Sequence, residues 1–136
     1  MDTQQKGQLA QLKVEQRALE LGYITSKPTF DARYDLIIDN GVNLLRAQIK
    51  YGDGNVSNAS GAIRVDFRKY PGNKKDKYRL YYSNEIDIML VYIPKIDKIC
   101  CLDKNLFEGK TCKHIRLELA KSNMKKGIVY AKNILW

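Results

Sequence analysis

The chain has 136 residues, and its 24 Lys and Arg outnumber its 15 Asp and Glu, which gives a formal net charge of +9 at pH 7. This length predicts a single domain over residues 1–136, and a hydrophobic share of 44% argues against a disordered chain. The sequence also lacks the run of about 20 apolar residues that a membrane helix needs and the apolar core of a signal peptide, so the excess positive charge makes a polyanion the leading class of partner.

The first predicted element is a helix over residues 5–21, ended by Gly22, a residue type common just after helix C-termini. At 100° per residue, one stripe of this helix is apolar and a second apolar stripe lies beside it. Glu15 projects inside this arc as its only charged residue. A carboxylate aimed at a core needs a partner or a metal ion, so Glu15 is a candidate functional residue. The stripes consist of Ala10, Val14, Ala18 and Leu21, and of Leu12 and Leu19.

A hairpin follows a loop over residues 25–33. Its strands are predicted over residues 34–39 and 44–51, joined by an Asn-Gly turn. Asp35 opens the first strand. In the second strand, the two-residue period places Gln48 and Lys50 side by side on one face.

A basic segment lies in the middle of the chain. After a polar, Gly-rich loop over residues 52–61, strands at 63–69 and 78–82 are predicted to form a ribbon, as part of an insertion at about residues 52–82. Residues 64–79 hold seven basic residues and two acids, a net charge of +5, with tyrosines interleaved. A two-stranded ribbon fits the DNA major groove, where arginines read guanine while lysines suit phosphates. The candidate DNA-binding residues are Arg64, Arg68, Lys69, Lys74, Lys75, Lys77, Tyr78 and Arg79.

The later elements complete a mixed fold. Residues 86–93 predict a buried central strand, residues 98–102 a further strand, and residues 115–119 a strand near the surface. Residues 124–136 are expected to be helical, and their apolar side chains are a candidate interface between copies or a part of the core. The order of elements predicts an α/β (α+β) fold with a mixed central sheet flanked by helices.

The three cysteines indicate the compartment. Their number is odd, Cys100 and Cys101 are adjacent, and Cys112 stands alone, without a Cys-x-x-Cys pair. We therefore expect reduced, mostly buried thiols in a cytoplasmic protein.

The spacing of Glu15, Asp35, Gln48 and Lys50 resembles the PD-(D/E)XK nuclease superfamily, in which an acid starts one strand of a hairpin and the next strand carries acid-x-lysine. The chain looks in particular like the small enzymes associated with group I introns, and most like the cyanobacterial intron-encoded homing endonuclease branch. Asp87 matches a recurrent acid of that branch. The motifs of this resemblance are Gly7-Gln8-Leu9, Glu15, Leu21-Gly22-Tyr23, Ser26-Lys27-Pro28, Tyr34-Asp35-Leu36-Ile37 and Gln48-Ile49-Lys50-Tyr51.

The resemblance implies a restriction-endonuclease-like core and a metal-dependent site. It implies Glu15, Asp35, Gln48 and Lys50 as catalytic residues, and Mg²⁺ or another divalent cation held by Asp35, Glu15 and the carbonyl of Ile49. Gln48 departs from the usual acid. Because an amide brings no charge, we expect a second metal ion to bind more weakly.

The resemblance, together with the basic segment, implies a site-specific homing endonuclease that makes double-strand breaks in DNA. One active site cuts one strand, so at least two copies are needed, and the resemblance favours a homotetramer over a dimer. Two alternatives remain open: a Holliday-junction resolvase of the same fold, and a non-catalytic nucleic-acid-binding module in which Gln48 marks a decayed site. In the simplest alternative, Glu15 is a helix-surface acid and residues 64–79 form only a solvated basic face.

Overall fold

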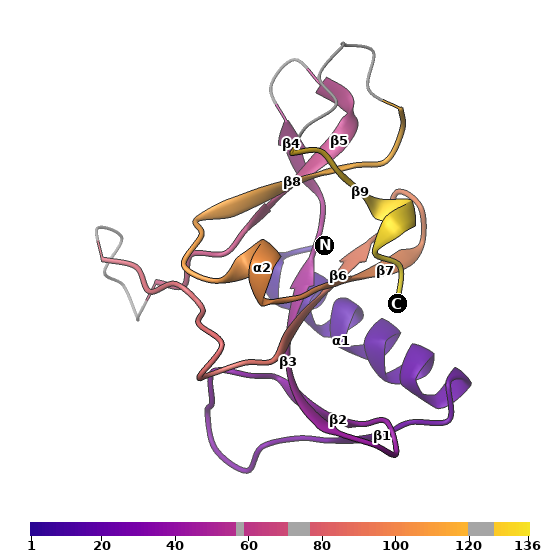
Figure 1. Ribbon diagram of the computed structural model, residues 1–136, viewed down its shortest axis with the longest axis vertical. Helices are drawn as coiled ribbons and strands as arrows, with labels where there is room; N and C mark the ends of the chain where they lie inside the picture. Colours follow the sequence, from indigo (N-terminus) through magenta and orange to yellow (C-terminus); the bar gives the residue numbers. More distant parts are fainter. Residues whose placement is uncertain (57–58, 71–76, 120–126) are drawn as a thin grey trace.

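The computed structural model describes residues 1–56, 59–70, 77–119 and 127–136 of the chain, in two mixed sheets and short helical segments (Figure 1). The helical segments are α1 (Thr3–Glu20), α2 (Lys104–Phe107) and the 3-10 turn η1 (Ala131–Asn133). The five-stranded sheet has the order β1 (Ile24–Ser26), β2 (Leu36–Asp39), β3 (Leu44–Tyr51), β6 (Ile88–Ile93), β7 (Lys98–Leu102). The four-stranded sheet has the order β4 (Gly54–Val56), β5 (Ala59–Asp66), β8 (Cys112–Arg116), β9 (Val129–Tyr130).

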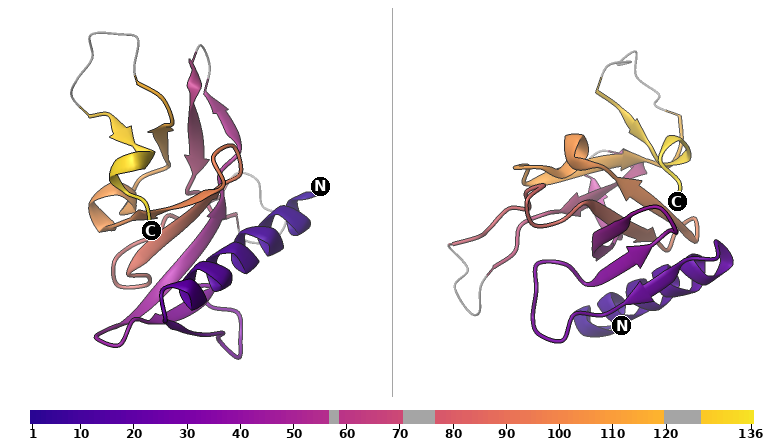
Figure 2. Two further views of the ribbon diagram at one scale, coloured as in Figure 1. Left: turned by 90° about the vertical axis from the view of Figure 1, so that its right-hand side faces the viewer. Right: turned by 60° about the horizontal axis from the view of Figure 1, so that its bottom comes forward.

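The five-stranded sheet is covered on both faces. Helix α1 lies along one face and the four-stranded sheet stands on the other side (Figure 2). Strand β6 shows the consequence, because Leu90 packs in the cluster under α1, whereas its neighbours Met89 and Val91 pack in the cluster of the second sheet. A strand buried on both faces needs a continuous apolar run, and it pairs in parallel with β3. The predicted buried central strand is therefore confirmed, but the layer opposite α1 is a sheet and not a helix.

Helix α1 is confirmed with a narrower buried stripe than predicted. Asp2 caps it, accepting a hydrogen bond from the Gln5 N–H at 2.8 Å in a capping box, and Gly22 follows it with φ +78°. The predicted second stripe faces solvent, since Leu12 is 52% and Leu19 is 76% exposed. The helix rests on the sheet through small side chains, and within the described residues no layer covers its other side. The side chains that it buries are Ala10, Val14 and Ala18.

The hairpin of β2 and β3 is also confirmed. The strands pair antiparallel with Leu36 opposite Ala47, and Gly41 in the turn has φ +87°. Leu36, Ala47 and Ile49 pack under α1. Since successive side chains point to opposite faces, the side chains of Gln48 and Lys50 point away from α1.

The basic segment folds differently from the prediction. Part of the expected loop at 52–61 forms β4 and the start of β5, and β5 pairs with β4 and β8 in the second sheet. Within residues 63–70 and 77–82, the expected ribbon is reduced to one antiparallel bridge, in which Lys69 and Arg79 exchange backbone hydrogen bonds of 2.9 and 2.8 Å. The apolar face of β5 explains the difference, because Ile63 and Val65 are buried against the five-stranded sheet.

The C-terminal prediction of a helix is wrong for the described residues 127–136. This segment contains β9 and η1 and then runs beside β7, where the Cys101 N–H donates to the Ile134 carbonyl at 2.7 Å and the Trp136 N–H donates to the Ile99 carbonyl at 2.9 Å. These hydrogen bonds pair backbone groups at the edge of β7 and keep the C-terminal segment extended. Ile134 and Trp136 thereby join the core clusters; residues 124–126 lie outside the described residues.

Smaller differences concern short elements. Strand β1 overlaps the start of the expected loop at 25–33, and α2 was not predicted. Strand β8 ends before the predicted strand at 115–119 does, with Ile115 fully buried. The three cysteines are free, as expected, and Cys100 is buried. No described helix is both long and apolar enough to cross a membrane.

Candidate active site

Asp35 lies just before β2, where the backbone holds its carboxylate. Its Oδ2 accepts a hydrogen bond from the Ile49 N–H at 2.8 Å, while its own N–H donates to the Ala47 carbonyl at 2.9 Å. Burial raises the pKa of Asp35, and the Ile49 N–H, Lys69 and Lys50 oppose this shift. Oδ1 has no hydrogen-bond partner among the described residues. The structure thus presents a partly buried carboxylate with one oxygen available to a cation.

The side chain of Lys50, on β3, lies near Asp35 and is partly shielded from solvent. Its Nζ lies 5.3 Å from the centroid of the Tyr81 ring. Burial lowers the pKa of Lys50, Lys69 lowers it further, and Asp35 raises it. Asp35 and Lys50 are therefore near enough to influence each other, as the sequence predicts.

Gln48 is buried beside them, with 8% of its surface exposed. Its Nε2 donates to the Ile49 carbonyl across a long 3.4 Å. The amide of Gln48 therefore lies against the backbone oxygen that is predicted as a metal ligand.

Glu15 has a different partner from the one expected. Its Oε1 lies 3.5 Å from Nζ of Lys27, and its side chain is 23% exposed at the edge of α1. The carboxylate is thus paired with a lysine and is not aimed at the core. Asp35, Gln48 and Lys50 come together, whereas the ion pair of Glu15 is with a residue after β1. Among the described residues, no cluster of three or more His, Cys, Asp or Glu could hold a metal.

The remaining donors still suit Mg²⁺ in a site completed by substrate. Mg²⁺ is often held by one or two carboxylates together with phosphate oxygens and waters. A partly buried carboxylate with an unpaired oxygen, as at Asp35, fits this pattern.

Tyr81 and Arg33 complete this group, and the sequence did not single them out. The Arg33 guanidinium lies 4.3 Å from the Tyr81 ring centroid. Its Nε is 2.6 Å from Glu85 Oε2, and its Nη2 donates to the Leu80 carbonyl at 2.8 Å. In the sequence, Tyr81 is one of several tyrosines near the basic segment, and nothing marks it as buried. Its burial depends on packing against the four-stranded sheet.

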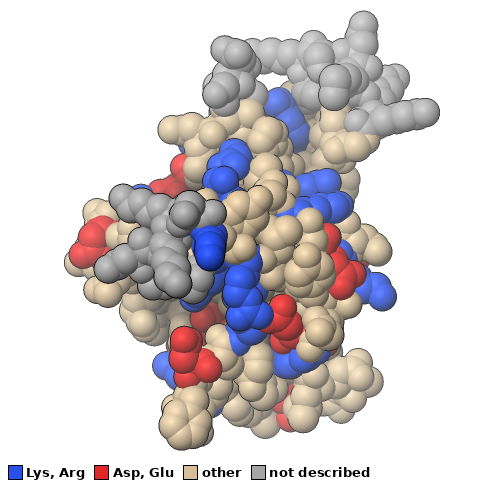
Figure 3. Space-filling view, turned by 90° about the vertical axis from the view of Figure 1, so that its left-hand side faces the viewer, with Lys and Arg blue, Asp and Glu red and all other residues tan. Residues whose placement is uncertain are grey.

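The predicted DNA-binding residues differ in their surroundings. Arg64 and Arg68 both pair with Asp66, at 3.9 and 2.7 Å, and the Arg68 hydrogen bonds hold the pKa of Asp66 below its ordinary value. Lys69 and Arg79 lie opposite each other in an isolated antiparallel bridge. Lys77 and Tyr78 are exposed, while Lys74 and Lys75 lie outside the described residues. Lys and Arg side chains are spread over the face drawn in Figure 3, with Asp and Glu side chains among them.

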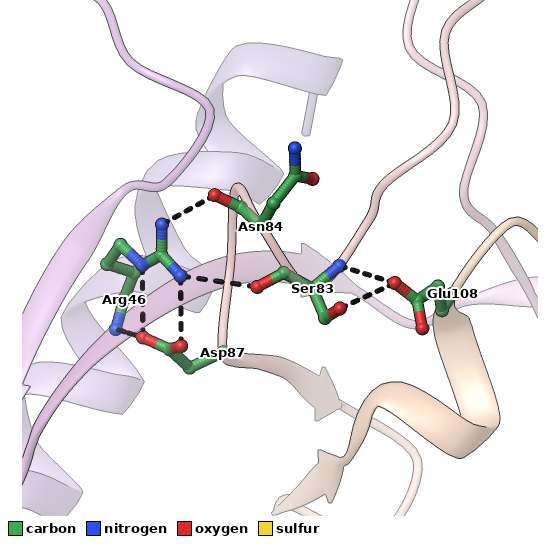
Figure 4. Close-up of polar contacts among 5 residues, drawn as sticks. All are labelled: Arg46, Ser83, Asn84, Asp87 and Glu108. Atoms are coloured by element: carbon green, nitrogen blue, oxygen red, sulfur yellow. Dashed lines mark hydrogen bonds and ion pairs between the residues drawn. The ribbon is translucent and has the colours of Figure 1, made fainter.

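A polar network attaches the end of this segment to β3 (Figure 4). Arg46 and Asp87 form a two-pronged ion pair, with Nη2 3.0 Å from Oδ1 and Nε 3.1 Å from Oδ2. Arg46 also donates to the carbonyls of Asn84 and Ser83, at 2.9 and 3.3 Å. Ser83 in turn donates its hydroxyl to Glu108 at 2.6 Å. Asp87 therefore braces the turn at residues 83–87 against β3.

Comparisons with known proteins point in the same direction. The sequence profile of the family described as PD-(D/E)XK endonuclease matches residues 1–134. Among solved structures, that of the bacterial homing endonuclease I-Ssp6803I is similar with a TM-score of 0.78 and 24% sequence identity, covering 99% of this chain and 89% of that chain. No curated protein matches the chain.

Proposed function

Because the chain belongs to the PD-(D/E)XK endonuclease family, we propose that it is a site-specific DNA endonuclease of the intron-homing type, which hydrolyses phosphodiester bonds with a divalent cation. The observation that carries this proposal is the placement of Asp35 and Lys50 on one side of the β2–β3 hairpin. The likeness to a bacterial homing endonuclease over 99% of the chain supports the homing assignment.

The residues of the site suit phosphodiester hydrolysis. Asp35 Oδ1 and the Ile49 carbonyl would hold Mg²⁺, and Glu15 could join them only after its ion pair with Lys27 opens. The ion, when bound, supplies polarisation of the phosphate and acidifies a bound water. Lys50, as its ammonium form, offsets negative charge that develops on the phosphate oxygens. Gln48 accepts a hydrogen bond from a water and orients it.

A hairpin at residues 69–79 and the basic side chains beside it are proposed to bind double-stranded DNA. The contributing side chains are proposed to be Arg64, Arg68, Lys69, Lys74, Lys75, Lys77, Tyr78 and Arg79. Two copies would cut the two strands of a near-palindromic site. The family resemblance favours a homotetramer over a dimer for a long site.

One assay on three substrates tests the function. The protein is incubated with Mg²⁺ and a linear duplex from candidate intron insertion sites, a random-sequence duplex, or a four-way junction. We expect double-strand cleavage of an insertion-site duplex alone. Cleavage of the junction irrespective of sequence would indicate a resolvase, and binding to all three without cleavage would indicate a binding module.

A further inference from the structure

A pocket of about 480 Å³ opens beside the Asp35–Lys50 group. Arg33, Lys69, Arg79 and Tyr81 line it, together with the acid Asp31. Asp35 and Lys50 do not line it, so the pocket adjoins the proposed cleavage centre without coinciding with it. Tyr81 connects the two, because the same ring that lines the pocket lies 5.3 Å from the Lys50 Nζ.

Tyr81 is the unusual residue in the lining of this pocket. Tyr81 is 1% exposed, and its hydroxyl is buried without a hydrogen-bond partner among the described residues. A buried polar group in this condition is costly and rare, so it calls for a partner that the described residues do not supply. Burial raises the pKa of Tyr81 to about 12, so the hydroxyl keeps its proton and is a donor. A hydroxyl that can donate a hydrogen bond but has no acceptor is suited to bind an anionic oxygen atom of a ligand.

The charges around the hydroxyl have the matching sign. The Lys69–Arg79 bridge places these two residues directly opposite each other, with side chains on one side of the hairpin. Glu85 lies 2.6 Å from the Arg33 Nε and 3.5 Å from an Arg79 nitrogen, so it orients both guanidinium groups. The lining has three cationic side chains and one acidic side chain, Asp31. Of the three cations, Lys69 has no ion-pair partner among the described residues.

We propose that this pocket binds a phosphate of the DNA backbone that neighbours the phosphate to be cut, and that the Tyr81 hydroxyl donates a hydrogen bond to it. The proposal rests on the proposed function, since it supposes that the cut phosphate lies at Asp35 and Lys50. Tyr81 is then a positioning residue. It fixes the strand through the neighbouring phosphate and holds the Lys50 ammonium against its ring.

The test compares two tyrosines that are adjacent in the chain. Tyr81→Phe keeps the ring and removes only the hydroxyl, and Tyr82→Phe is the matched control because Tyr82 does not line this pocket. Affinity for a random-sequence duplex is measured without divalent cation at several salt concentrations, and thermal unfolding is measured without DNA. We expect Tyr81→Phe to weaken binding about tenfold with the salt slope unchanged, because it removes a neutral donor to a charged acceptor.

The unfolding temperature of the free Tyr81→Phe protein distinguishes a role in DNA binding from a role in the stability of the core. Removal of an unpaired buried hydroxyl should leave the Tm of the free protein unchanged or raised. A second variant, Lys69→Gln, should reduce the slope of log K against log salt by about one, because one phosphate contact is lost. Tyr82→Phe should match the wild type in every measurement.

The outcomes separate the two proposals. If Tyr81→Phe binds and cuts like the wild type, the phosphate pocket is wrong while the endonuclease function stands. If the wild type binds duplex but cuts none, the proposed function fails, and the binding of Tyr81→Phe and Lys69→Gln still decides the pocket. A Tyr81→Phe variant that loses Tm together with affinity indicates a core role, unless Lys69→Gln shows the reduced slope. A wild type that does not bind duplex overturns both.

Discussion

Asp35 and Lys50 lie in surroundings that oppose their charged forms. Burial raises the pKa of Asp35 and lowers that of Lys50, while each charge favours the ionised form of the other. Lys69 lowers the pKa of both groups. Such a partly desolvated pair of opposite charges is typical of functional sites, because charged groups are seldom buried without a use.

Substitution of either member should abolish cleavage and spare binding. We expect Lys50→Ala and Asp35→Asn to reduce the single-turnover cleavage rate by about 100-fold or more, since each removes charge that acts on the reacting phosphate. Asp35→Asn should bind DNA at least as tightly as the wild type, because it removes a negative charge. The matched control is Lys98→Ala, at an exposed position of β7. A loss of DNA binding equal to the loss of rate would instead give these residues a binding role.

Gln48 offers a test of the charge of the metal site. Gln48→Glu adds a second carboxylate next to the Ile49 carbonyl, so the Mg²⁺ concentration for half-maximal cleavage should fall severalfold. Gln16→Glu adds the same charge at an exposed position of α1 and serves as the control. If both variants require as much Mg²⁺ as the wild type, the neutral amide does not limit metal binding.

At the scale of elements, the turn at residues 83–87 connects the hairpin to β3. The Arg46–Asp87 pair is partly buried, and Arg46 binds two carbonyls of the turn besides the carboxylate. The Arg46 hydrogen bond holds the pKa of Asp87 below its ordinary value. A multiply bonded ion pair of this kind contributes more to stability than a single exposed pair.

The stability of this turn should depend on pH. Because the pKa of Asp87 is lowered on folding, its contribution is present above the unfolded value of about 4 and is lost as the pH falls through the folded value. Asp87→Asn should therefore cost about 1–2 kcal/mol in the free energy of unfolding near neutral pH, with a smaller difference from wild type below about pH 4. Chemical denaturation across pH measures this difference.

Asp53→Asn is the control for that experiment, because it breaks the more exposed pair of Asp53 with Lys6. Its cost should stay below that of Asp87→Asn near neutral pH, because solvent screens this pair. Equal costs for the two variants would show that the turn does not depend on the Arg46–Asp87 pair.

At the scale of the whole molecule, the net charge of +9 is not all available to a polyanion. Asp66 neutralises part of it, through its pairs with Arg64 and Arg68. Asp66→Asn should thus free these arginines, tighten binding to random duplex and steepen its salt dependence by about one unit of slope. Glu20→Gln is the control, because it makes the same change in net charge on α1, away from these arginines, and it should have a smaller effect on DNA binding. Weaker binding by Asp66→Asn would show that Asp66 holds Arg68 in its DNA-contacting position.

Under the proposed function, we expect double-strand cleavage to need more than one copy of this chain. When wild type is mixed with an excess of Lys50→Ala, assemblies with one active site should nick a single strand, so nicked duplex should accumulate at the expense of linear products. Gel analysis of a supercoiled substrate measures both products, and sedimentation of the wild type reports whether four chains associate. Unchanged linear product in the mixture would mean that one chain makes both cuts.

Local patterns in the sequence determined α1, the β2–β3 hairpin, the two-sided burial of β6, and the shared face of Gln48 and Lys50. These features follow from hydrophobic periodicity, a capping glycine and an Asn-Gly turn, which act over a few neighbouring residues. The match of residues 1–134 to the PD-(D/E)XK endonuclease family agrees with the resemblance that those residues carry.

Tertiary structure alone decided the rest. The pairing of β5 with β8, the extended course of the C-terminal segment beside β7, and the Glu15–Lys27 ion pair all depend on which distant segments meet. The same holds for Tyr81, which becomes a buried donor beside Lys50 only because the second sheet closes over it. Periodicity shows which face of an element is apolar, but the layer that covers this face is set by packing between residues far apart in the chain.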